Sequence, residues 1–126
     1  MKFMIMVKGP ECTSPPPKAL MDAIGQLGVE ATQAGVMVMT GGLGPTAMSA
    51  RVRVKGGKVI ATDGPFTETK EVVGGYAVYD LKSKEEALEW TKRFMDLHRQ
   101  HWPGWEGEAE IRPMFEVPEF TCDGKK

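Results

Sequence analysis

The order of its apolar runs constrains the fold of this chain more than any other feature. Residues 3–7 form a continuous apolar run, which is typical of a strand covered on both faces, and 36–40 and 72–81 are further strand-like runs. Two longer stretches, 17–34 and 83–101, repeat their apolar residues at helical spacing. A final alternating stretch contains Pro113, which indicates a sheet edge or a junction with another subunit.

Between the second and third of these runs, the sequence predicts a β-hairpin. Residues 48–55 alternate apolar with polar side chains, and Gly56-Gly57 is a two-residue loop that tolerates positive φ. The predicted pairs are Lys55 with Lys58, Val54 with Val59, Val52 with Ala61, Arg51 with Thr62 and Ala50 with Asp63. This register points Asp63 to the apolar side of the hairpin, where a carboxylate needs donors or a cavity.

Without the hairpin, the element order is βαββαβ, the split unit of ferredoxin-like α+β folds. Such a sheet covers one face with its two helices. The other face is apolar enough to predict pairing with a second subunit, so we expect a homodimer. We expect one domain over 1–118 and a C-terminal tail over 119–126.

Charge and cysteine content exclude several functions. The 126 residues carry a net charge of −1, which gives no electrostatic reason to bind nucleic acid or an anionic membrane. Cys12 and Cys122 stand far apart with no adjacent histidine, so we expect free thiols, no metal site and no cofactor. The N-terminal apolar run is too short for a signal peptide or a membrane span, which predicts a cytoplasmic protein.

Residues 62–71, Thr-Asp-Gly-Pro-Phe-Thr-Glu-Thr-Lys-Glu, are the most unusual segment. Asp63 is either a general acid or base, or an acceptor for the amides of its own turn. Phe66 is interpreted as a lid or core anchor. Glu68 and Lys70 are either solvated charges or contacts to a ligand or a partner subunit. Arg51 is either a solvated strand residue or a site for an anionic group.

The segment 63–71 resembles the signature of the DGPF proteins, a branch of the YCII-related family, and differs from it only at Thr67. The resemblance continues through Gly74-Gly75-Tyr76, 86–90 and 110–113. It implies a ferredoxin-like subunit that dimerises into an α/β barrel. Some YCII-like proteins are thought to use a His–Asp acid–base pair, but here no histidine precedes His98. DGPF proteins also occur beside sigma factors of the extracytoplasmic class.

Two functional hypotheses follow for this chain, beside a structural one in which the loop holds the barrel dimer together. In the first, it is a small-molecule-binding protein, in which Asp63 provides acid–base catalysis in a dimer cavity. Lys70, Glu68 or Arg51 would then hold the ligand and Phe66 would close the pocket. In the second, it is a non-catalytic sensing or partner-binding module associated with a sigma factor. His98 and His101, at a helix end, are interpreted as charges that favour the helix dipole.

Overall fold

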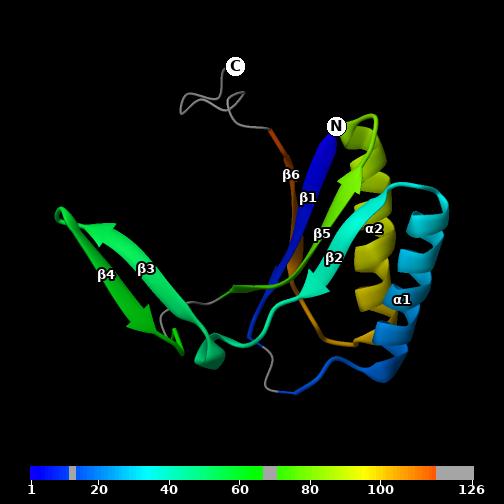
Figure 1. Cartoon of the computed structure of the whole chain (residues 1–126). Coiled ribbons are helices and arrows are strands. Elements are labelled where there is room, and N and C mark those ends of the chain that lie inside the picture. The colour runs from blue at the N-terminus through cyan, green and yellow to red at the C-terminus, as the bar shows by residue number, and fades with distance from the viewer. Residues whose placement is uncertain (12–13, 67–70, 116–126) are drawn as a thin grey trace.

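The computed structural model describes residues 1–11, 14–66 and 71–115, and its elements follow the predicted order (Figure 1). The strands are β1 (Lys2–Gly9), β2 (Met37–Gly42), β3 (Ala50–Lys55), β4 (Lys58–Asp63), β5 (Val72–Asp80) and β6 (Glu108–Pro113). The helices are α1 (Lys18–Gln33), the short 3₁₀ helix η1 (Thr46–Met48) and α2 (Lys84–His101). Neither long helix has the length and apolar character needed to cross a bilayer.

Four strands form the main sheet in the order β2-β5-β1-β6, and every neighbouring pair is antiparallel. With the β3–β4 hairpin set aside, this is the strand order of the ferredoxin-like fold, which confirms the predicted α+β class. Both helices lie on one face of this sheet (Figure 1). The edge position predicted from Pro113 is also confirmed, because β6 pairs only with β1 in the described sheet.

The core fills the space between the helices and one end of the sheet. Its buried members are Phe3, Ile5, Ala31, Tyr79, Leu81 and Ala87, which come from β1, α1, the end of β5 and α2. Leu20 and Leu27 continue the apolar stripe of α1, as its periodicity predicted. On α2 the buried residues are Ala87, Thr91 and His98, and Trp90 packs against the core cluster.

Local signals in the sequence explain where the elements begin and end. Gly35 has φ of 76° directly after α1, as expected of a left-handed helix terminus. Ser83 caps α2 by accepting a hydrogen bond from the Glu86 amide at 3.2 Å. The Glu86 side chain reaches back to the Lys82 amide, one residue earlier than a standard capping box requires.

Strands β3 and β4 form a separate two-stranded sheet, the hairpin arm, which extends away from the main sheet (Figure 1). Its register agrees with the prediction at all pairs, from Ala50 with Asp63 to Lys55 with Lys58. The expected burial of its apolar side was wrong for the single chain. Val52, Val54 and Val59 are 69%, 79% and 73% exposed, and Asp63 on the same side is exposed as well.

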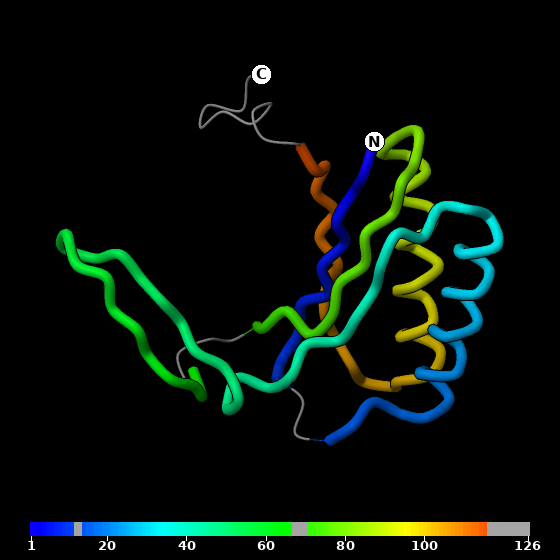
Figure 2. The backbone as a smooth tube through the Cα atoms, viewed as in Figure 1, coloured from blue at the N-terminus to red at the C-terminus, as the bar shows by residue number. Residues whose placement is uncertain are grey.

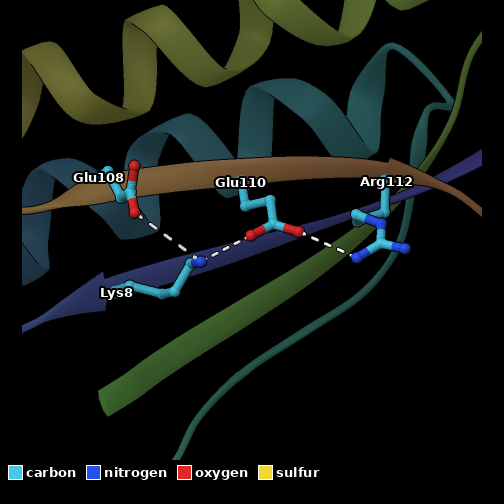
Figure 3. Close-up of polar contacts among 4 residues, drawn as sticks. All are labelled: Lys8, Glu108, Glu110 and Arg112. Atoms are coloured by element: carbon cyan, nitrogen blue, oxygen red, sulfur yellow. Dashed lines mark hydrogen bonds and ion pairs between the residues drawn. The ribbon is translucent and has the colours of Figure 1, made fainter. Parts of the chain in front are cut away.

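A row of alternating charges joins β6 to β1 (Figure 3). Lys8 donates a hydrogen bond to Glu110 at 2.6 Å, Glu108 lies 3.8 Å from the same ammonium, and Arg112 contacts the other Glu110 oxygen at 3.2 Å. The hydrogen bond raises the pKa of Lys8 and lowers that of Glu110. These four side chains compensate one another, so the row fastens an edge strand and needs no ligand.

The described start of the signature segment, at the end of β4, lies against η1 (Figure 2). The Gly64 amide donates to the Ser49 carbonyl at 2.8 Å. A Cβ at Gly64 would lie only 1.6 Å from the Thr46 carbonyl oxygen. Glycine is therefore required at position 64 by the close approach of two backbone segments.

We expect Gly64→Ala to destabilise the protein by about 1–3 kcal/mol, because the added methyl group forces the two segments apart. Urea unfolding measures the change. Gly25→Ala is the matched control, since a Cβ at this α1 position meets nothing within 4 Å. It should stabilise the protein by about 0.5–1 kcal/mol through helix propensity. A Gly64→Ala protein as stable as wild type would contradict the close approach.

Candidate functional site

A cavity of about 580 Å³ lies between the main sheet and the two helices, next to the core cluster, whose members Ile5 and Tyr79 also line it. The sheet wall is unusual, because five strand glycines contribute to it: Gly9, Gly41, Gly42, Gly74 and Gly75. At one end of the sheet, Phe3 and Leu81 fill the gap between the sheet and the helices. At the other end, the glycines have no side chain to fill it. The helices supply the opposite wall through Leu20, Met21, Ile24, Trp90, Thr91, Phe94 and His98.

A chain of four aromatic rings closes the cavity near the C-terminal end of α2. His98 lies between Phe94 and Trp105, with both ring centroids 4.8 Å away, and Trp102 stacks on Trp105 at 5.8 Å. A second hollow, of about 380 Å³, lies against the same group and is also lined by His98, Trp102 and Trp105. The ring cluster is thus a partition between the cavity and the outer hollow.

Two glycines determine where the Trp105 ring lies. A Cβ at Gly9 would come within 3.0 Å of this ring, and one at Gly107 within 2.5 Å. The Trp105 amide also donates to the Trp102 carbonyl at 3.1 Å, which closes the turn after α2. The ring therefore fits only because both neighbouring positions lack a side chain. This packing holds one wall of the cavity in place.

His98 is held in one orientation by its own helix. It is 6% exposed, and its Nδ1 lies 3.1 Å from the Phe94 carbonyl oxygen. A carbonyl only accepts, so Nδ1 carries the hydrogen and Nε2 of the neutral ring keeps its lone pair. Burial lowers the pKa of His98, and the hydrogen bond to Phe94 offsets this only in part. His98 is therefore a neutral acceptor at neutral pH.

Two further polar side chains that line the cavity, Thr91 and Tyr79, are buried. Thr91 donates its hydroxyl hydrogen to the Ala87 carbonyl at 2.7 Å, so its polar group is used within α2. Tyr79 is 4% exposed, and its burial raises the pKa of the phenol. The described lining contains no lysine or arginine. A ligand with an unpaired negative charge would therefore be strongly disfavoured here.

Asp63 lies elsewhere, at the exposed end of β4 and outside the cavity lining. Among the described residues, no amide of its own turn donates to the Asp63 carboxylate. The Gly64 amide donates to Ser49, the Phe66 amide points to the Thr46 hydroxyl at 3.5 Å, and Pro65 has no N–H. Within the described chain no donor reaches the Asp63 carboxylate. Its predicted catalytic role stays a prediction.

The structure brings two of the predicted site residues together. The Arg51 guanidinium lies 3.9 Å from the centroid of the Phe66 ring, a cation–π contact on the signature segment. Neither residue lines the cavity, so the predicted pocket lid is not formed by Phe66 within one chain. Glu68 and Lys70 lie outside the described residues, as do Cys12, Cys122 and the tail 119–126.

Glu11 is a residue of this region that the sequence did not single out. Its two carboxylate oxygens accept hydrogen bonds from the Thr46 hydroxyl at 2.6 Å and the Thr46 amide at 2.5 Å. These bonds lower the pKa of Glu11. Thr46 in turn accepts from Phe66. Glu11 therefore connects the loop after β1 to the signature segment, beside one end of the cavity.

The interpretation of His98 as a helix-end charge was wrong, since the side chain is buried and its pKa is lowered. One signal was present in the sequence. Ala87, Thr91, Phe94 and His98 repeat at spacings of four, three and four, which continues the inward stripe of α2 to the histidine. The ring of Trp105, which completes its burial, follows a turn that no periodicity locates.

We expect His98 to make the stability of the protein depend on pH. The unfolded chain binds a proton at the ordinary histidine pKa of 6.5, whereas the folded protein binds it only at lower pH. The contribution of neutral His98 to the free energy of unfolding is therefore complete above pH 6.5. It is lost as pH falls through the pKa of His98 in the folded protein. The difference in unfolding free energy between wild type and His98→Gln, measured in urea, should therefore change across this range. His101→Gln should follow wild type, and a parallel His98→Gln curve would contradict the assignment.

Comparison with known proteins identifies the family. The family model of the YCII-related domain matches residues 1–95. The uncharacterized protein R00369 of Rhizobium meliloti (strain 1021) is 33% identical over 82 residues, which cover 65% of this chain. The match spans 62% of that relative's own length. The sequence signature, the ferredoxin-like strand order and the family model agree, and the chain belongs to the YCII-related domain family.

Proposed function

We propose that this protein binds an uncharged, largely apolar small molecule in the cavity between its sheet and its helices. The observation that carries the proposal is the cavity itself, at about 580 Å³. Ligand sites typically have volumes of about 300–1,000 Å³ and mostly apolar walls with a few fixed polar groups. Sheet glycines, aliphatic and aromatic helix side chains and the buried His98 fit that description.

The walls support binding with little rearrangement. Trp105 is confined by Gly9 and Gly107, and His98 is confined between two rings and bonded to its own helix. A site whose side chains are already ordered loses less conformational entropy when a ligand enters. Burying apolar ligand surface against such walls contributes about 25 cal/mol per Å² before the losses of association are subtracted.

Acid–base catalysis by Asp63 is a separate proposal, because Asp63 does not line this cavity. It requires a second chain or a ligand to supply a hydrogen-bond partner for the Asp63 carboxylate, because no described residue near the exposed end of β4 does so. The sensing or sigma-factor-linked role, membership in the DGPF branch and the roles of Glu68 and Lys70 likewise stay predictions from the resemblance. Binding in the cavity is compatible with either an enzyme or a sensor.

Cavity binding can be measured with the protein's own tryptophans, because Trp90, Trp102 and Trp105 are all the tryptophans of the chain and all line the cavity. N-phenylnaphthylamine, a neutral apolar dye, should quench tryptophan emission saturably and gain sensitised emission. Ile24→Phe adds a ring to the helix wall, so it should weaken dye binding roughly tenfold, or about 1.4 kcal/mol.

The matched control is Val29→Phe, which places the same ring on the same helix at a position 50% exposed and outside the lining. Its dye affinity should equal that of wild type. Asp63→Ala should also leave dye binding unchanged. Equal weakening by both phenylalanine variants, or no saturable quenching of wild type, would contradict binding in this cavity.

A second proposal concerns assembly: we propose that the hairpin arm packs against a second copy of the chain. A two-stranded hairpin is marginally stable in water by itself. Here one side of it presents Val52, Val54 and Val59, each more than two-thirds exposed, and Met48, next to it, is 82% exposed. Met39 on the main sheet is 52% exposed. Apolar surface of this kind is commonly covered by another subunit.

The double variant Val54→Lys/Val59→Lys should shift the protein from dimer to monomer, because it places two charges on one cross-strand pair of the arm. Light scattering after size exclusion measures the mass. Ile60→Lys is the matched control: Ile60 pairs with Arg53 on the opposite side of the same arm and should leave the mass unchanged. A monomeric wild type, or a dimeric double variant, would overturn this proposal.

A further inference from the structure

His98 has one ring nitrogen that no described residue uses. No buried side-chain nitrogen or oxygen of the described residues lacks a hydrogen-bond partner. The structure gives Nδ1 of His98 the Phe94 carbonyl and gives Nε2 no partner among those residues. Nε2 must therefore reach open space, and the open spaces that His98 lines are the cavity and the outer hollow behind the ring partition.

An acceptor in this position discriminates between ligands. His98 is more than nine-tenths buried, and its ring is fixed between Phe94 and Trp105. A ligand that brings a hydroxyl or N–H donor to Nε2 gains a hydrogen bond, whereas one that brings only an acceptor confronts the lone pair of Nε2. A site built to receive a donor rejects an analogue that lacks it, because its own polar group is then left unpaired.

We propose that the ligand of this cavity is an uncharged molecule with a hydroxyl or N–H group, which donates a hydrogen bond to Nε2 of His98. This inference rests on the proposed binding function and adds the chemical class of the ligand and the residue that selects it. His98 is here a binding residue, and no covalent step is involved.

The groups around His98 leave this assignment intact. Arg99 and Glu106 share the outer hollow with it, and Glu11 and Tyr79 share the cavity lining. Arg99 is paired with Asp96 at 2.6 Å. Burial is the main cause of the lowered His98 pKa, which keeps the ring neutral at neutral pH. In acid the ring gains a proton, Nε2 becomes a donor, and the preference for donor ligands should disappear.

The test compares β-naphthol with its methyl ether, two uncharged bicyclic probes that differ in the donor hydrogen and the added methyl group. Isothermal titration calorimetry on the full chain should give β-naphthol roughly tenfold higher affinity at neutral pH, the value of one good hydrogen bond. His98→Phe keeps a ring between Phe94 and Trp105 and should remove the preference. His98→Gln retains an acceptor, so it should keep the preference and carry it into acid, where wild type loses it.

The possible results separate the two proposals. If neither probe binds wild type, the proposed function fails and this inference fails with it. If both probes bind equally, or if His98→Phe keeps the preference for β-naphthol, the cavity binds ligands but His98 does not select them. A preference that is lost in His98→Phe, kept in His98→Gln and lost by wild type in acid supports the inference. A merely structural role for His98 would weaken both probes alike.

Discussion

The gap between one four-stranded sheet and two helices is the constraint on which the rest of this structure depends. Layers of this kind must be filled by side chains to the density of an organic crystal. Phe3, Tyr79 and Leu81 do so at one end, against Ala31 and Ala87 of the helices. At the other end, glycines of β1, β2 and β5 leave part of the gap between the layers unfilled. The cavity therefore follows from the positions of large residues and of glycines along the strands.

The signature segment and the turn after α2 have different structural roles. The signature segment is fixed to η1 by close backbone packing at Gly64, and Thr46 connects it onward to Glu11 at the edge of the cavity. The turn after α2 carries Trp105 back onto His98. The first region connects the loop after β1 to the base of the hairpin arm, while the second places His98 in the cavity lining. Within one chain, the signature therefore has a structural reason for its glycine that is independent of catalysis.

Much of the fold could be predicted because its signals are local. Alternation fixed the hairpin register from Lys55 to Asp63, and Gly35 and Ser83 marked helix boundaries. The site was predicted less well. Attention fell on Asp63, Phe66 and Arg51, of which the last two do lie together but away from the cavity. The burial of His98 is completed by Trp105, which follows a turn, so it could not be inferred from spacing alone.

The sequence by itself determined the element order, the antiparallel hairpin and the family, because periodicity, turn residues and a nine-residue signature are properties of neighbours along the chain. Only the tertiary structure decided which glycines leave space and which are in close contact. Gly64 and Gly107 are crowded by backbone, whereas Gly74 has nothing within 4 Å of its Cβ position and lines a cavity. Tertiary packing also made His98 a neutral acceptor, since its pKa is lowered first by burial. The turn that places Trp105 on His98 completes that burial, and no periodicity locates this turn.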